Sequence, residues 1–379
     1  MTFSVAEARF LAANADAISA VEPEIALTKK SVFADRAVLD QHFGDYARAV
    51  SALIAARRAA AGKFPAHWLT DADAAQQATP ARVAGVRAAR IAAAGAQMVH
   101  DVTCSVGSEA PAFRQRGIAW MGSDLDMPRL IMARHNLGQE AWLAQADALR
   151  PVTSDGVVVA DPARRAGGRR ITDPAQLLPP LPDLLDAHAG REMAVKCAPG
   201  IDYSEWDGLV SVVSVDGGVK EACLYTPGLA GGVRREAVVL REVEERVTDL
   251  DDDTVETTAP QRYIIDPDGA VVRAGLVRGW AARHGLNMLD EHIAYLTGEQ
   301  IPAGYSGFPF LEAVPLRALK KALASHGAGS VEILVRGVDV DPDQLRKKLK
   351  LRGKAQMAVV IARIGDQAVA HVCGPRVHA

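Results

Sequence analysis

The sequence has few cysteines, few aromatic residues and almost no net charge. Its 379 residues include four cysteines and 5% aromatic residues, and the formal net charge is −3. The cysteines lie far apart and form no C-x-x-C pair, which argues against a disulfide scaffold or a zinc ribbon. Because no basic excess extends over the whole chain, a nucleic-acid partner would have to be met by a local patch.

Long apolar runs are also absent, and we expect no secretory leader. No uninterrupted apolar stretch approaches the roughly 18–20 residues that cross a bilayer, and Glu7, Arg9 and Asp16 interrupt the N-terminal segment. With 49% apolar residues and so small a net charge, the composition is not that of a disordered chain. We therefore expect a cytoplasmic protein of two or three domains with no membrane contact.

The pattern of apolar residues divides the chain into four regions. Residues 1–78 predict helices, since Ala, Leu and Ile recur there at helical spacing. Residues 79–246 alternate strands with helices, a pattern typical of a parallel sheet, and end in an antiparallel strand pair. An acidic linker is expected at 247–261, and residues 262–379 predict a small α+β region. The expected class is α/β, with a Rossmann-like sheet.

Two of the predicted helices have clear boundary signals. A helix over 81–94 is expected to follow Thr79 as its N-cap, with Pro80 at the first helical position and Gly95 after its end. A second, uninterrupted helix is expected over 270–284. Both expectations are specific enough to be tested by the structure.

Aspartates end four successive predicted strands. Open α/β sheets bind ligands at the carboxyl ends of their strands, where a carboxylate can accept ribose hydroxyls or an adenine amino group. One aspartate at a strand end is usually a helix cap, but four in succession indicate a nucleoside-type ligand. The four residues are Asp101, Asp124, Asp147 and Asp161.

The loop after the first of these strands argues against a dinucleotide. A pyrophosphate site needs G-x-G-x-x-G, but only Gly107 fits that spacing, and Thr103 and Ser105 stand where the other glycines would be. A nicotinamide dehydrogenase is therefore disfavoured. A nucleoside cofactor without a phosphate fits this loop better.

At these residues the chain resembles the class I S-adenosylmethionine-dependent methyltransferases. Asp101–Gly107 is similar to their first motif, and Asp161–Arg164 is similar to their fourth motif in a D-P-P-R-like variant. The resemblance implies S-adenosyl-L-methionine as the cofactor. It also implies cofactor-binding roles for Asp101, Thr103, Ser105, Gly107, Asp124 and Asp147.

Most of the remaining chain resembles a bacterial family of methyltransferase-like proteins with a C-terminal THUMP-like domain, here about residues 314–379. Ser105 departs from the methyltransferase pattern, because glycine is usual there and a Cβ approaches the methionine part of the cofactor; serine is small, so we interpret it as tolerated. An inactive scaffold that binds RNA or protein still stays open as an alternative, as does a small-molecule methyltransferase. The segments that carry this resemblance are Gln76–Ala94, Lys196–Gly200, Arg262–Thr297 and Val331–Gly353.

Asp161 and Arg164 are the expected catalytic residues. Asp161 ends the strand nearest the reactive methyl group in this fold, where it would orient or deprotonate the acceptor. The alternative is that Asp161 caps the next segment or holds Arg164. Methyl transfer from a sulfonium requires no metal. Cys197 lies at the end of the fifth predicted strand, near the place where some pyrimidine methyltransferases carry a nucleophilic cysteine. Its sequence neighbours do not match theirs, so we expect Cys197 and Cys104 to be buried thiols.

Two basic clusters are the expected RNA contacts. The first could equally be a solvated loop, and the second, which is of a kind that is usually a solvated helix face, gains support from its place in the THUMP-like module. Arg164–Arg170 holds four arginines beside the expected active site, and Arg346–Lys354 carries six cations. THUMP-like modules are associated with RNA binding, so the leading hypothesis is methylation of structured RNA, either tRNA or rRNA, presented by this module. The oligomeric state stays open. The expected substrate-binding residues are Arg165, Arg169, Arg170, Arg346, Lys347 and Lys348.

Overall fold

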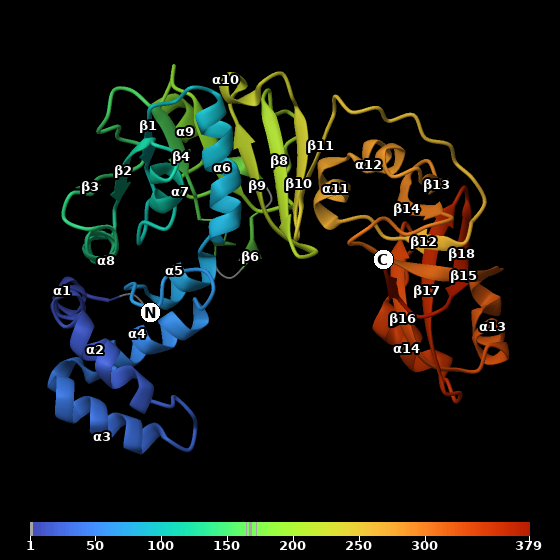
Figure 1. Ribbon diagram of the computed structural model, residues 1–379, viewed down its shortest axis with the longest axis horizontal. Helices are drawn as coiled ribbons and strands as arrows, with labels where there is room; N and C mark the ends of the chain where they lie inside the picture. The colour runs from blue at the N-terminus through green and yellow to red at the C-terminus, as the bar shows by residue number, and fades with distance from the viewer. Residues whose placement is uncertain (1–2, 164, 167–168, 172) are drawn as a thin grey trace. The chain divides into compact units, whose positions relative to one another are not determined.

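The computed structural model describes residues 3–163, 165–166, 169–171 and 173–379 (Figure 1). The chain divides into two compact units. The first unit comprises Met1–Ser211 and Lys220–Arg234, and the second comprises Val212–Val219 and Arg235–Ala379. The domain boundaries predicted from the sequence stay predictions. Within the described residues, no helix is both long and apolar enough to cross a membrane.

The first unit begins with helices, as the sequence predicts. Their apolar faces share one core, in which Leu11, Ile18, Leu39 and Leu53 are fully buried. The helix α1 begins with a capping box, because Ser4 accepts from the amide of Glu7 while the Glu7 carboxylate accepts from the amide of Ser4. These helices are α1 (Val5–Ala13), α2 (Ala15–Val21), α3 (Val32–Phe43), α4 (Ala47–Ala59) and α5 (Ala72–Gln77).

The helix α6 (Ala81–Ala93) leads into the sheet, but the predicted N-cap is wrong. Pro80 occupies the cap position with an extended backbone (ψ 140°), so the helix starts one residue later than the sequence signals suggest. Thr79 is buried one residue before the cap. The strand β1 (Met98–Asp101) follows directly, and α6 packs on it through Ala88 and Ile91.

The strands form a nine-stranded sheet in the order β11-β10-β8-β9-β7-β4-β1-β2-β3. β3, β2, β1, β4 and β7 run parallel, whereas β7 pairs with β9 and β10 pairs with β11 in the antiparallel sense. This confirms the predicted Rossmann-like parallel sheet with an antiparallel end. The remaining strands are β2 (Ala119–Asp124), β3 (Trp142–Gln145), β4 (Val157–Ala160), β7 (Met193–Cys197), β8 (Leu209–Val215), β9 (Gly218–Tyr225), β10 (Arg235–Leu240) and β11 (Glu244–Thr248).

Short helices connect the parallel strands, as their crossovers require. The core on one face of the sheet joins Phe113, Leu130 and Trp120 with the apolar side of α6. Because these strands run parallel, the strand ends that were predicted to bind a ligand all lie at one edge of the sheet. The helices between parallel strands are α7 (Ala110–Arg114), α8 (Met127–Leu137) and α9 (Leu181–Ala187), whereas α10 (Pro227–Ala230) lies between β9 and β10.

The C-terminal part of the chain contains a second sheet of eight strands, in the order β13-β14-β12-β15-β18-β17-β16, with β19 pairing β15. β16 and β17 are parallel, and α14 (Pro342–Leu349) connects them. The helix α13 (Leu319–Ser325) lies between β15 and β16. The strands of this sheet are β12 (Tyr263–Ile265), β13 (Asn287–Asp290), β14 (Ile293–Gly298), β15 (Ser306–Pro315), β16 (Ala328–Arg336), β17 (Ala355–Ile364), β18 (Gln367–Cys373) and β19 (Val377–His378).

The uninterrupted helix predicted over 270–284 is wrong. The structure has α11 (Gly269–Ala274) and α12 (Val277–Arg283), separated at Gly275. Gly275 adopts a left-handed backbone (φ 75°) and its amide donates to Val272, which is the usual glycine ending of a helix. The hydrophobic period reads as continuous across Gly275, although the helix ends there and a second one starts at Val277.

Candidate functional site

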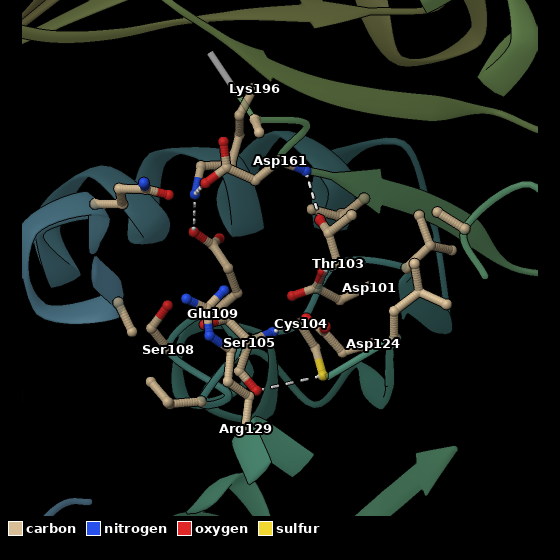
Figure 2. A pocket seen from close by; sticks show the side chains of 18 of the residues that line it. Asp101, Thr103, Cys104, Ser105, Ser108, Glu109, Asp124, Arg129, Asp161 and Lys196 are labelled. Atoms are coloured by element: carbon tan, nitrogen blue, oxygen red, sulfur yellow. Dashed lines mark hydrogen bonds and ion pairs between the residues drawn. The ribbon is translucent and has the colours of Figure 1, made fainter. Parts of the chain in front are cut away.

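A cavity of about 440 Å³ opens at the carboxyl ends of the parallel strands (Figure 2). This volume lies within the range of small-molecule sites. The aspartates that end the four predicted strands all line it, so the structure brings together segments that are up to 60 residues apart. The predicted site residues in its wall are Asp101, Thr103, Ser105, Asp124, Asp147 and Asp161.

The loop after β1 reaches into the cavity through an unusual backbone conformation. Ser105 has a positive φ of 50°, a left-handed conformation that costs a non-glycine residue roughly 1–2 kcal/mol. Its amide donates to Asp124 Oδ2 at 2.8 Å, which holds the loop against the end of β2. Ser105 thus adopts the kind of conformation that glycine favours, and its departure from the family pattern leaves the loop intact.

Gly107 is placed differently from the other predicted cofactor residues, because it is not among the described residues that line the cavity. Its φ is 84°, and an added Cβ would lie 2.6 Å from Leu137 Cδ1. A side chain at this position would therefore collide with the end of α8. The structure explains Gly107 by packing, and its predicted contact with the cofactor stays a prediction.

Two of the aspartates organise the turns that follow their strands. Asp124 accepts from the amide of Asp126 at 2.9 Å as well as from Ser105, and burial raises its pKa. Asp147 accepts from the amide of Leu149 at 2.9 Å. Each carboxylate oxygen can accept a further hydrogen bond, so these contacts are compatible with binding a hydroxyl or an amino group.

Asp101 is a buried carboxyl group that is poorly satisfied in the described part of the chain. Its side chain accepts one hydrogen bond, from the Thr103 amide at a long 3.3 Å. Burial and the neighbouring charge of Glu109 raise the pKa of Asp101 to about 8. A cationic group bound beside Asp101 would reverse this shift, because an opposite charge favours the ionised carboxylate.

A chain of buried charged residues lies behind Asp161. Lys196 Nζ lies 2.8 Å from Asp161 Oδ2 and 3.3 Å from Glu109 Oε1 (Figure 2). Glu109 in turn pairs with Arg87 (Nε to Oε2, 3.2 Å), and Arg87 pairs with Glu221. The sequence analysis missed these roles; the available signal was a lysine in the otherwise apolar strand β7.

The helical N-terminal region also supplies part of the cavity wall. Gln77, at the end of α5, and Ala78 and Thr79, which follow it, line the cavity. Asp71 fastens this segment, because it caps α5 and its buried carboxylate pairs with Arg129 of α8 at 3.0 Å. The role of this region was left open by the sequence, and the structure places it at the site.

The donor set fits S-adenosyl-L-methionine. This cofactor carries a positively charged sulfonium and an amino group, and the buried Asp101 carboxyl group is suited to a cation. Its nucleoside part offers hydroxyl and amino donors to Asp124 and Asp147, both at strand ends in the same wall. Leu125, which is largely exposed, adds an apolar surface to the same cavity.

The arginines near the fourth motif are placed only in part. Arg164 lies outside the described residues. Arg165 belongs to β5 (Arg165–Ala166), which pairs in the antiparallel sense with β6 (Arg169–Arg170), while their side chains lie outside the described part. The roles predicted for these arginines stay predictions.

The basic residues of α14 lie in the second unit. Lys347 and Lys348 are exposed. Arg346 pairs with Asp343 and donates from Nε to the Val331 carbonyl at 3.3 Å, so part of its capacity is used within the module. The structure therefore makes the two lysines the more available cations of this cluster.

The cysteines behave as predicted. Cys104 and Cys197 are both buried and reduced. Cys104 is the one cysteine among the described residues that line the cavity, and burial together with the charges of Asp101 and Asp124 raises its pKa well above the usual range. Its thiol therefore stays protonated and is a poor nucleophile.

Comparisons with known proteins agree with this geometry. Residues 306–375 match the family described as THUMP domain-like. Two relatives from Mycobacterium tuberculosis strains (CDC 1551 and H37Rv), both named S-adenosylmethionine-dependent methyltransferases, are 48% identical over 349 residues, covering 87% of this chain and 96% of each relative. A solved structure described as a methyltransferase from Porphyromonas gingivalis W83 has a similar fold, with a TM-score of 0.67, 17% identity, and coverage of 92% of this chain and 99% of that one.

Proposed function

We propose that this chain, which belongs to the S-adenosylmethionine-dependent methyltransferase family of the mycobacterial relatives, methylates structured RNA, either tRNA or rRNA. The observation that carries the proposal is the THUMP-like match at residues 306–375, which contains the exposed cations of α14. Cations on one face position an RNA backbone through phosphate contacts. A small-molecule substrate would not need this added basic module.

Each predicted cofactor-binding residue would contact a different part of S-adenosyl-L-methionine. Asp101, with Thr103 and Ser105 in the same loop, would meet the methionine end, Asp124 the ribose and Asp147 the adenine. When bound, S-adenosyl-L-methionine supplies an activated methyl group on a sulfonium. The cavity wall would exclude water around this group, since Gln77, Thr79 and Leu178, which come from other segments of the chain, also line the cavity.

Asp161 is the proposed catalytic residue on the acceptor side, together with Arg164. The Asp161 amide donates to Thr103 Oγ1 at 2.6 Å, and its carboxylate is held by Lys196, so both ends of the residue are fixed. A fixed carboxylate can orient the acceptor, which is the main task in an in-line methyl transfer. Arg165, Arg169 and Arg170 would contact phosphates beside the acceptor nucleotide.

Two binding measurements test this function. Calorimetry with S-adenosylhomocysteine tests the cofactor site, and the absence of measurable binding would rule it out. Binding of an unmodified tRNA and rRNA transcript pool tests the RNA claim through its salt dependence. Replacing Arg346, Lys347 and Lys348 with alanine should weaken binding and reduce the slope of log affinity against log salt by about 0.7–0.9 per lost phosphate contact. An unchanged slope would favour a small-molecule substrate.

A further inference from the structure

Lys196 is a lysine at the floor of the cavity whose charge is almost completely removed from water. Its side chain is 3% exposed, and all five residues of β7 are buried. Its ammonium group contacts both Asp161 Oδ2, at 2.8 Å, and Glu109 Oε1, at 3.3 Å. Removing an ammonium group from water is costly, and the two carboxylates offset this cost for Lys196 by pairing with its charge.

The partners of Lys196 are themselves fixed. Arg87 on α6 holds Glu109 through two nitrogens and also pairs with Glu221 on β9. Burial alone would lower the pKa of Lys196, but the charges of Asp161 and Glu109 outweigh it and raise the pKa. Lys196 is therefore a permanent cation in a rigid frame, and it presents Asp161 to the cavity.

A carboxylate paired with an ammonium group is a weak base but a good hydrogen-bond acceptor. A hydroxyl acceptor would need a stronger base to remove its proton before attack. A pyrimidine carbon would need a thiolate, and the thiol of Cys104 stays protonated. A nitrogen with an N–H needs only an acceptor that orients it and takes a proton that becomes strongly acidic as the new bond forms.

We propose that Lys196 is a positioning residue that fixes the Asp161 carboxylate as the acceptor of an N–H of the substrate, so that this pocket methylates nitrogen. The inference rests on the proposed function and names its target atom. The nitrogen lone pair forms a new N–C bond to the methyl carbon, while the C–S bond breaks and its electron pair stays on sulfur, giving a neutral thioether. The nitrogen then loses its proton to the Asp161 carboxylate and from there to solvent.

The methylated atom can be identified with the wild-type full-length chain. The purified protein is incubated with methyl-tritiated S-adenosylmethionine and extract from a strain that lacks this gene, and the labelled product is hydrolysed and identified by mass. We expect an N-methylated nucleoside in ribonuclease-sensitive material. Label on oxygen or carbon would overturn the nitrogen inference. N-methyl label in ribonuclease-resistant material would overturn the RNA proposal and leave the nitrogen inference standing, and no label would overturn both.

Three variants test the role of Lys196. Lys196→Arg keeps the cation and should retain activity within about tenfold, whereas Lys196→Gln should lose at least 100-fold in kcat. The acid limb of the activity profile of Lys196→Gln should move up by about one pH unit or more, because the cation that favours the ionised Asp161 is gone. Lys220→Gln, at an exposed lysine on β9, is the matched control and should behave as wild type.

Calorimetry with S-adenosylhomocysteine separates positioning from folding. Lys196→Gln should bind this probe within about threefold of wild type. Equal activity of Lys196→Gln and wild type, or a loss of activity with no shift of the profile and no rescue by arginine, would overturn the positioning role. The identity of the methylated atom does not depend on any variant, so the nitrogen inference stays testable if Lys196→Gln does not fold.

Discussion

Two carboxyl groups, one in each unit, have opposite pKa shifts: Asp101 is buried and lines the cavity, whereas Glu245 is half-buried within a cluster of side chains. Within the described residues Asp101 accepts a single long hydrogen bond, and its pKa is raised to about 8. Glu245 accepts from His284 at 2.8 Å, from Trp280 at 3.2 Å and from Tyr305. These hydrogen bonds outweigh burial and lower the pKa of Glu245 to about 2.

The difference lies in what each carboxylate still needs. Glu245 is saturated by donors from α12 and from the segment before β15, so its charge contributes to stability. Asp101 lines a cavity, and burial and the charge of Glu109 destabilise the ionised form of its carboxyl group. A carboxyl group that the fold leaves poorly satisfied beside a cavity is a candidate for a functional site, and we propose that Asp101 meets the cationic end of the cofactor.

The largest effect is expected on the catalytic side of the cavity. Asp161→Ala should lower methylation of RNA by about 10²–10⁴-fold, because it removes the acceptor that orients the substrate. Binding of S-adenosylhomocysteine should change little, since Asp161 is assigned to the acceptor. The measurement is single-turnover methylation with calorimetry on the same sample. If the Asp161→Ala protein keeps its full cellular role, the chain acts as a scaffold and Asp161 is not a catalytic residue.

The second effect is a gain of stability at the cofactor site. The pKa of Asp101 is raised in the folded state, so folding binds a proton between pH 4 and 8 and the free energy of unfolding falls across this range as pH rises. Asp101→Asn should remove this loss of about 1.4 kcal/mol per pH unit and stabilise the ligand-free protein at pH 7. Urea unfolding at pH 5 and 7 measures it.

The same variant should lose affinity for S-adenosylmethionine, because the amide cannot offer a negative charge to the cofactor. A stabilised variant with unchanged cofactor affinity would show that Asp101 is not part of the site. The comparison with Glu245 would then lose its functional meaning.

The third effect is a loss of stability in the other cluster. Glu245→Ala should lower the free energy of unfolding by about 2 kcal/mol, because it leaves the donors of Trp280, His284 and Tyr305 without their acceptor. Cofactor binding should stay unchanged. Thermal unfolding and calorimetry check both statements, and an affinity loss larger than about threefold would contradict the separation of the two clusters.

The smallest effect is expected at Ser105. Ser105→Gly should raise stability by about 1 kcal/mol at most, since glycine adopts the left-handed backbone without the steric penalty while adding some chain entropy to the unfolded state. S-adenosylhomocysteine should bind at least as tightly as to wild type. If this substitution creates binding that wild type lacks, the wild-type chain is an inactive member of its family.

The strand-end aspartates could be predicted because their position depends on local pattern alone. A strand of four or five apolar residues followed by aspartate places the carboxylate at the sheet edge, and the parallel order of β1, β2 and β4 brings such ends together. The same reasoning identified the parallel sheet and its antiparallel end. No knowledge of distant contacts was needed.

The buried charge chain could not be predicted in this way. Its members come from four separate segments of the chain, and in the sequence each one looks like an ordinary charged residue. They are Arg87, Glu109, Lys196 and Glu221. The break at Gly275 was missed because the apolar period continues across it, and glycine within a helix is tolerated often enough to be overlooked. Both misses concern contacts or backbone angles that only the folded chain specifies.

RNA methylation by this protein can be tested in cells by nucleoside mass spectrometry of RNA from a strain that lacks this gene. We expect one methylated nucleoside of tRNA or rRNA to disappear, with its methyl group on nitrogen, and we expect the wild-type gene to restore it while Asp161→Ala does not. A nucleoside profile identical to that of the parent strain would show that the protein does not methylate these RNAs.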